Sequence, residues 1–455
     1  MWYEVLYRVL SIINYVVLII IAIPLLWQVI IVLLSWLPKR TYERSEVKGR
    51  IAFFIPAHNE EDVIYDTVKS IIEKQNYPRE LFDVLVVADN CTDRTAELAE
   101  KAGAIVLIHN DPDPAHQMAA YPVKFAIDHI MAIEDNPYDM VIRVDADNHL
   151  NDDFALYMND AFQSGVDYAR PYEGAMNATQ NFYTKACAIF YAFDSRFGAR
   201  VRERLHIGQH VNGPGAMMSM RMLKATGGFE CTSMAEDTEY MIKMLEKGYK
   251  GHFVEDAVVY EDMPSSSRDT YNRNLRIGSG GAKLLKSDIW RLFGKFFITG
   301  NFSYLDVFLT YGFVFLSVLA WWLPVYYVYD FIFVSFCAYG KLAVTMFAAQ
   351  YYMDTLWYTV IVLGSILVAL FVLFGWVQAL ILVVSDYRKM NSKNRRSLAS
   401  VVLAFPVFLI FYSATVSFGA MSKPKWRKVS RNKTNLTDQT DQTDQENQTD
   451  QTDQN

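Results

Sequence analysis

Ile51-Ala-Phe-Phe-Ile-Pro56 and Asp83-Val-Leu-Val-Val-Ala88 are the two stretches that decide the fold. Each is a short apolar run of strand length, the pattern of a strand buried on both faces. Two further runs of this kind occupy residues 104–108 and 140–144. Helical patterns lie between these runs, and this alternation predicts an α/β domain with a Rossmann-like, parallel, doubly wound sheet.

Two helices are predicted from the residues that follow the first two strands. Asn59-Glu60-Glu61 is expected to open the first helix, because acids in a first turn interact favourably with the helix dipole. Thr92 or Asp93 is expected to cap the second helix, which runs through Glu100 and is ended by Gly103.

Acidic residues follow two of the predicted strands, and ligands of doubly wound sheets bind beyond such strand ends. Asp89 follows the second strand, and Asp145-Ala-Asp147 follows the fourth. Two carboxylates spaced by one residue can converge on a hard divalent cation through oxygen ligands. A solvated loop would explain the same residues without a ligand.

Glu236-Asp237 is a second acidic pair, at the start of a predicted helix that turns Tyr240, Met241 and Leu245 inward. An aspartate in a first turn can simply favour the helix N-terminus, by about 0.3–1 kcal/mol. It can also be a general base that accepts a proton from a hydroxyl group. The residue types leave both interpretations open.

The composition is too apolar for a purely soluble enzyme: of 455 residues, 52% are hydrophobic and 20% are charged. Residues 9–38 carry no charge, a run longer than the roughly 20 residues that span a bilayer, and Lys and Arg follow it directly. We expect a membrane anchor over residues 1–40 and a cytosolic domain after it. The net charge of −7 argues against nucleic acid as a partner, and the four scattered cysteines fit reduced thiols.

Further apolar runs, at residues 307–329, 355–385 and 398–422, predict a C-terminal transmembrane region over 305–422. Basic and aromatic residues mix over 286–304, which predicts interfacial helices.

The side of the C-terminus is ambiguous. Three crossings after the domain would leave the end of the chain outside, whereas the basic residues between 423 and 433 indicate inside. Either one run is a re-entrant element or residues 331–352 hide another crossing. Residues 434–455 repeat Thr-Asp-Gln and predict a disordered acidic tail.

Six segments between residues 51 and 281 stand out in this order: Ile55-Pro-Ala-His-Asn-Glu60, Val87-Ala-Asp-Asn-Cys-Thr-Asp-Arg-Thr-Ala96, Val144-Asp-Ala-Asp147, Asn212-Gly-Pro-Gly215 with Gly227-Gly-Phe229, Ala235-Glu-Asp237 and Tyr260-Glu-Asp-Met-Pro264. Together they resemble the motifs of membrane-bound family 2 glycosyltransferases, which are related to cellulose, hyaluronan and poly-N-acetylglucosamine synthases and have threonine where this chain has Ala235. The resemblance implies a glycosyltransferase A-type domain over residues 50–285, flanked by transmembrane helices.

The resemblance also implies an activity: inverting transfer of a sugar from a nucleoside diphosphate, a UDP-hexose or UDP-N-acetylhexosamine, to a polysaccharide or other surface glycan. The implied catalytic residues are Asp237, as general base, and Glu236. The implied donor-binding residues are Ala57, Glu60, Asp89, Asp145, Arg273 and Arg276. Mg²⁺ or Mn²⁺ would be held by Asp145 and Asp147, and the acceptor would be bound by Gly213, Gly215 and Ile277. The enzyme would be integral to the plasma membrane, in contact with lipid, with its catalytic domain in the cytoplasm.

One motif departs from the processive members, which carry Gln-x-x-Arg-Trp where this chain has Arg273-Asn-Leu-Arg276-Ile277. Isoleucine offers no flat aromatic face on which an acceptor sugar can stack. An alternative is therefore a non-processive transferase that acts on a lipid-linked acceptor. Outside the enzymes, the rivals are a membrane scaffold and a transporter component, although the runs 307–329 and 355–385 lack the charges of a transport pathway.

Overall fold

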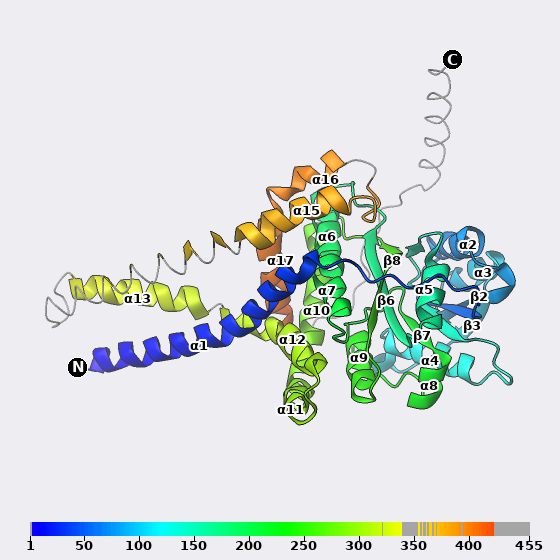
Figure 1. Cartoon of the computed structure of the whole chain (residues 1–455), viewed down its shortest axis with the longest axis horizontal. Coiled ribbons are helices and arrows are strands. Elements are labelled where there is room, and N and C mark those ends of the chain that lie inside the picture. The colour runs from blue at the N-terminus through cyan, green and yellow to red at the C-terminus, as the bar shows by residue number, and fades with distance from the viewer. Residues whose placement is uncertain are drawn as a thin grey trace, which may run out of the picture.

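A computed structural model describes residues 2–320, 322–338, 371–392 and 395–422, with isolated positions between 354 and 369. Its centre is an eight-stranded sheet with the strand order β3-β2-β1-β4-β7-β6-β8-β5 (Figure 1). The strands are β1 Ile51–Ala57, β2 Phe82–Asp89, β3 Ile105–His109, β4 Met140–Arg143, β5 His149–Leu150, β6 Tyr168–Ala175, β7 Met217–Ser219 and β8 His252–Glu261.

The half of the sheet formed by β1 to β4 confirms the prediction. These strands pair in parallel, and their bounds differ from the predicted ones by no more than one residue. Beyond β4 the predicted all-parallel sheet is wrong, because β7 runs antiparallel to β4 and β6, and β5 antiparallel to β8. The α/β class is confirmed, but the sheet is mixed.

Strand β6 explains why the second half of the sheet was missed. All of its residues are buried, yet it contains Arg170 and Glu173, which form an ion pair at 3.0 Å. A buried charge pair breaks the continuous apolar run by which buried strands are recognised.

Helices cover both faces of the sheet. Successive side chains of a strand point to opposite faces, so Phe53 packs under α2, α3 and α5, whereas Phe54 packs under α4, α8 and α9. The helices of this domain are α2 Ile64–Lys74, α3 Thr95–Lys101, α4 Ala120–Met131, α5 Phe154–Gln163, α6 Phe182–Phe193, α7 Arg200–Arg204, α8 Met220–Thr226 and α9 Glu236–Glu246.

The predicted starts of α2 and α3 differ from the observed starts to different degrees. Asn59 does not open α2: it has a φ of 55°, in the left-handed region, and residues 58–63 form a turn before the helix starts at Ile64. The second start lies one residue later than predicted: Arg94 stands at the N-cap of α3, while Oδ1 of the preceding Asp93 accepts hydrogen bonds from the backbone N–H and the hydroxyl of Thr95. Gly103, at a φ of 100°, follows the end of α3.

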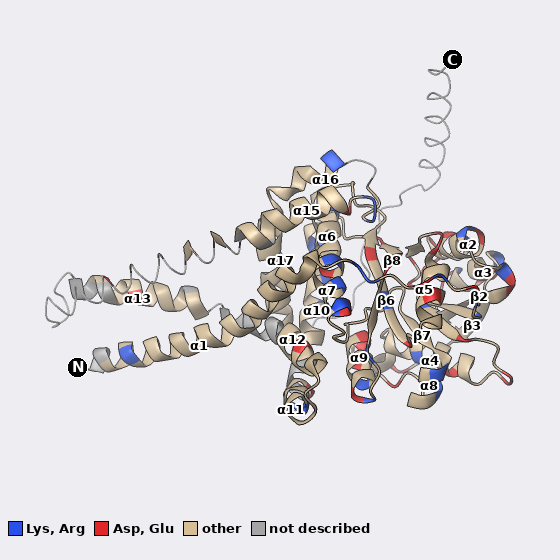
Figure 2. Cartoon of the chain, in the orientation of Figure 1, with Lys and Arg blue, Asp and Glu red and all other residues tan. Residues whose placement is uncertain are grey.

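Apolar helices extend from one side of this domain (Figure 1). Helices α1 and α13 run beside each other, and Figure 2 shows few charged residues on either, in contrast to the sheet domain. The helices of this part are α1 Trp2–Leu33, α10 Ser267–Ser287, α11 Ile289–Thr299, α12 Phe302–Ala320, α13 Trp322–Ala338, α15 Gln378–Ser385, α16 Arg395–Val402 and α17 Phe405–Ala420.

By length and composition, one described helix, Val5–Trp36, suffices to cross a membrane, and a second does if α16 and α17 count as one span. These two helices meet at an angle of 66°. The predicted tail over 434–455 and most of residues 339–370 lie outside the described residues.

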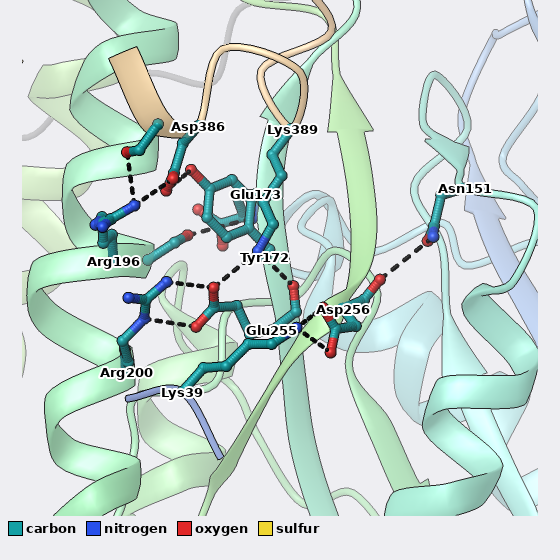
Figure 3. A network of polar contacts seen from close by, with 12 residues as sticks. Lys39, Asn151, Tyr172, Glu173, Arg196, Arg200, Glu255, Asp256, Asp386 and Lys389 are labelled. Atoms are coloured by element: carbon teal, nitrogen blue, oxygen red, sulfur yellow. Dashed lines mark hydrogen bonds and ion pairs between the residues drawn. The ribbon is translucent and has the colours of Figure 1, made fainter. Parts of the chain in front are cut away.

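The segment that follows α15 docks on the sheet domain (Figure 3). Nζ of Lys389 lies 2.8 Å from Oε1 of Glu255, whose carboxylate also accepts two hydrogen bonds from Arg200, at 2.7 and 2.5 Å. Asp386 of the same segment pairs with Arg196. These contacts hold residues 386–389 against the sheet domain.

Candidate active site

Asp145 and Asp147 lie directly beyond β4, where the sequence predicts them. The backbone N–H of Asn148 donates to the carbonyl of Asp145 at 3.0 Å, which closes the acidic segment into a turn. The hydroxyl of Thr67, on α2, donates to the carbonyl of Ala146 at 2.7 Å and fixes this turn against the helix. Both aspartates are half-buried. The turn therefore presents two carboxylates to solvent from a rigid strand end.

Arg143, the last residue of β4, connects these carboxylates to the second acidic pair. Its Nε lies 3.2 Å from Oδ1 of Asp145, and its Nη1 lies 2.9 Å from Oε1 of Glu236. Burial alone lowers the pKa of the Arg143 guanidinium, but the carboxylates of Asp145, Glu236 and Asp237 outweigh it and raise the pKa, so the side chain stays cationic. Asp145 and Glu236, which are far apart in the sequence, are thereby joined through one buried cation.

Sequence reasoning missed Arg143. The available signal is a basic residue inside an apolar strand immediately before two acids, because a charge is buried in such a place only when it is paired.

The predicted Asn212-Gly-Pro-Gly215 turn packs on the same arginine. A Cβ on Gly213 would lie 2.7 Å from Cζ of Arg143, so only glycine leaves room for the guanidinium. Gly215 has a φ of 71°, a conformation that favours glycine, and its N–H donates to the carbonyl of Arg143 at 2.8 Å. Both glycines thus shape the site through Arg143.

Glu236 and Asp237 begin α9, but they differ in environment. Glu236 is buried; its burial raises its pKa, Arg143 opposes the rise, and the adjacent Asp237 adds to it. Asp237 is only half-buried, and its Oδ1 accepts hydrogen bonds from the N–H of Thr238 at 2.6 Å and from its hydroxyl at 3.2 Å. Within the described chain, no residue donates to Oδ2 of Asp237. Asp237 therefore uses one oxygen at the helix N-terminus and keeps the other for a second role.

Ala57, Glu60 and Asp89 meet at the carboxyl ends of β1 and β2. The N–H of Glu60 donates to the hydroxyl of Thr95 at 2.7 Å, and the carbonyl of Ala57 accepts from Sγ of Cys91 at 3.4 Å. Oδ1 of Asp89 lies 2.7 Å from Nδ1 of His109, a partner that sequence reasoning missed. His109 ends β3 and is in register with Asp89, so strand pairing brings them together.

Helix α10 brings Arg273, Arg276 and Ile277 to this site. Nη2 of Arg273 lies 2.9 Å from Oε2 of Glu261, and its guanidinium covers the ring of Tyr191 at 4.7 Å. Arg276 has no carboxylate partner among the described residues; burial and the neighbouring Arg273 lower its pKa. An anion bound beside Arg276 would offset both effects. Ile277 is 39% exposed.

Asp145 and Asp147 suit a hard divalent cation, because they supply carboxylate oxygens that are accessible from solvent. Over the described ranges, no group of three His, Cys, Asp or Glu residues is arranged to hold a metal ion. The remaining ligands would therefore have to come from a bound donor and from water.

Comparisons with known proteins define the class. A model of the glycosyl transferase family group 2 matches residues 140–414, more than half of the chain, and a model of glycosyl transferase family 2 matches residues 52–227. The chain belongs to the family 2 glycosyltransferases.

Among its relatives, a probable glycosyltransferase YdaM of Bacillus subtilis is 25% identical over 53% of this chain and 59% of its own length. A poly-beta-1,6-N-acetyl-D-glucosamine synthase of Staphylococcus epidermidis is 21% identical over 54% of this chain and 58% of its own length. Both matches therefore leave about two fifths of the relative uncovered.

A mannosyltransferase of Pyrobaculum calidifontis, solved with GDP-mannose and Mn²⁺, has a similar fold. Its TM-score is 0.50 at 16% identity, and the match covers 91% of this chain and 98% of that one. The likeness supports the glycosyltransferase A-type fold.

Proposed function

We propose that this enzyme transfers a sugar, with inversion, from a UDP-hexose or UDP-N-acetylhexosamine to a polysaccharide or other surface glycan. The observation that carries the proposal is the bridge from Asp145 through Arg143 to Glu236. It holds the donor-side carboxylates and the Asp237 base at a fixed separation, which is what a single displacement at one carbon requires. Asp237 accepts the proton of the attacking hydroxyl through Oδ2, and Glu236 stays paired with Arg143.

Asp89, Ala57 and Glu60 bind the nucleoside in this proposal, since their strand ends form one edge of the sheet. Arg276 binds the diphosphate, supported by its lack of a carboxylate partner within the described residues. Arg273 is paired with Glu261, and it contributes positive charge to the donor site without contacting the donor directly. Gly213, Gly215 and Ile277 line the acceptor side.

Asp145 and Asp147 hold Mg²⁺ or Mn²⁺ in this proposal. Such a cation, when bound, neutralises the charge that develops on the diphosphate leaving group. The protein's part is to keep both carboxylates oriented, which the Thr67 contact to Ala146 and the Arg143 contact to Asp145 do.

We further propose that the enzyme is integral to the plasma membrane, anchored by α1, with the sheet domain in the cytoplasm. The apolar helix Val5–Trp36 supports the anchor, and the basic segment 386–389, docked beside Glu255, supports the side. The exposed Trp290, Phe297 and Ile298 of α11 support contact with lipid.

A second candidate is non-processive transfer to a lipid-linked acceptor. Two observations favour it. The exposed Ile277 cannot stack on a sugar ring, and its helix, α10, packs directly on the apolar α17, where Gly278 allows backbone contact with Val416. An acceptor with an apolar carrier would find both a sugar site and a membrane-side surface there.

The test is a donor screen on purified membranes that scores release of nucleoside diphosphate from uridine and guanosine sugars, with glycan and lipid-linked acceptors compared. Asp237→Asn is the inactive reference, and Asp152→Asn, an exposed aspartate after β5, is the matched control. Acceptor-dependent release from a UDP-sugar that is lost only in Asp237→Asn is expected. Equal release by all three proteins would refute the assignment.

A further inference from the structure

A line of hydrogen bonds leads from the Asp237 carboxylate into helix α12. The hydroxyl of Thr238 lies 3.2 Å from Oδ1 of Asp237, and the hydroxyl of Tyr311 lies 3.3 Å from that of Thr238. Nδ1 of His210 then contacts the Tyr311 hydroxyl. Tyr311 belongs to an apolar helix and His210 to the loop before the glycine turn, so three separate segments meet behind the carboxylate.

Each group in this line of hydrogen bonds donates to the neighbour that is nearer to Asp237. An ionised carboxylate only accepts, so the Thr238 hydroxyl donates to it, and the Thr238 oxygen is free to accept from Tyr311. The Tyr311 oxygen then accepts from Nδ1–H of His210. Burial lowers the pKa of His210, and although Asp237 opposes this, the imidazole is neutral with one N–H to give. The charged groups around Asp237 and His210 are Arg143, Glu236, Arg170, Asp194 and Arg202.

Helix α12 is itself held by both carboxylate oxygens of Asp306, which precedes Tyr311 on the helix. Oδ1 of Asp306 accepts from the indole N–H of Trp27 on α1 at 2.8 Å, and Oδ2 accepts from Nε of Arg202 on α7 at 2.7 Å. The Tyr311 hydroxyl is therefore placed by contacts to both the apolar bundle and the sheet domain.

We propose that Tyr311, supported by His210, is a positioning residue that orients the Asp237 carboxylate through the Thr238 hydroxyl. The proposal rests on the role of Asp237 as general base. In this proposal the rate of transfer depends on the position of α12. A shift of this helix breaks the hydrogen bonds that lead to Asp237, even when no residue that touches substrate moves.

The experiment compares Tyr311→Phe and Thr238→Val with Tyr304→Phe in the full-length protein in detergent. Tyr304 is the matched control: it lies on the same helix and is buried, but its hydroxyl donates to the carbonyl of Leu245 at 3.3 Å, away from Asp237. Both kcat and the donor KM are measured as functions of pH.

For Tyr311→Phe and Thr238→Val we expect kcat to fall about five- to tenfold, the scale of one lost hydrogen bond, with the donor KM unchanged. The acid limb of kcat should move to higher pH by about half a unit, because fewer donors stabilise the ionised carboxylate. Tyr304→Phe should keep the wild-type kcat and acid limb. Thr238→Val changes no residue of α12, so it provides the test if Tyr311→Phe does not accumulate.

Two failures are distinguishable. If Asp237→Asn is inactive while Tyr311→Phe and Thr238→Val match Tyr304→Phe in kcat and acid limb, the positioning role is overturned and the base assignment stands. If Asp237→Asn transfers at the wild-type rate, the base assignment is overturned and the positioning role with it.

Discussion

The contact between Gly213 and Arg143 can be tested by adding one carbon atom. In Gly213→Ala, the new Cβ would lie 2.7 Å from Cζ and 2.8 Å from Nη1 of Arg143, whereas ordinary van der Waals contact begins at 3.4 Å. The guanidinium must therefore retreat by about 0.7 Å. Its Nη1 is bonded to Oε1 of Glu236 at 2.9 Å, so a retreat of this size takes that bond to the limit of hydrogen-bonding distance.

The magnitude follows from what the retreat breaks. A hydrogen bond to a charged group contributes about 1.5–3 kcal/mol, and Glu236 would stay buried without it. We expect the free energy of unfolding to fall by about 1–3 kcal/mol. The same guanidinium contacts Asp145, so kcat should fall about tenfold, which corresponds to about 1.4 kcal/mol in activation free energy.

The assays are nucleoside diphosphate release and denaturant unfolding in detergent. Gly294→Ala on α11 is the control, because a Cβ there meets nothing within 4 Å. Adding Arg143→Lys to Gly213→Ala should recover part of the lost stability, since lysine has a slimmer head group. Equal kcat and equal stability for the two glycine variants would refute the reasoning.

Four further predictions follow from the site. Chelation should abolish transfer, and added Mn²⁺ or Mg²⁺ should restore it. Asp147→Asn should lower the affinity for the metal ion. Full activity in chelator would exclude the metal assignment. Asp237→Asn should lower kcat by roughly 10²-fold at unchanged donor affinity, and a collapse of donor affinity instead would favour a purely structural role. Burial, opposed by Arg273, raises the pKa of Glu261 from 4.5 to about 8. The folded protein therefore binds this proton more tightly, and the stability it adds is present at low pH and lost as pH rises from about 4.5 to about 8; the Tm of the wild type relative to Glu261→Gln should fall over that window, and a constant difference would contradict it. Ile277→Trp should lengthen the products under limiting enzyme, and unchanged product length would show that this position does not control processivity.

The sequence predicts best those strands that follow the apolar pattern of a buried strand throughout their length. Strands β1 to β4 are apolar throughout, and their bounds are found within one residue. Strand β6 is equally buried, but the ion pair of Arg170 and Glu173 inside it interrupts the apolar run by which a buried strand is recognised. The start of α2 fails for a local reason: Asn59 adopts a left-handed conformation that asparagine tolerates, so the chain turns before the helix begins.

The candidate site shows the same contrast between residues that a sequence pattern marks and residues that it does not. The acids Asp145, Asp147, Glu236 and Asp237 stand out by type and spacing, and the structure joins the two acidic pairs through the contacts of Arg143 with Asp145 and Glu236. Their partners do not stand out, because a partner is defined by distance in space. His109 comes from a neighbouring strand, and Tyr311 from a helix that the sequence marks only as apolar.

Three residues differ from the family pattern: Arg273 and Ile277, which lie on α10, and Ala235, which lies against α10. Ala235 stands where the family has threonine, and a Cβ on Gly280 of α10 would lie only 2.8 Å from its Cβ, so a small residue at 235 lets the two helices approach. Arg273 replaces glutamine and is bonded to Glu261, which secures α10 to β8. On the same helix, Ile277 keeps an exposed apolar side chain. These three differences leave Arg276, Asp145, Asp147 and Asp237 as the family pattern has them, and this separation predicts altered acceptor handling on an unaltered donor chemistry.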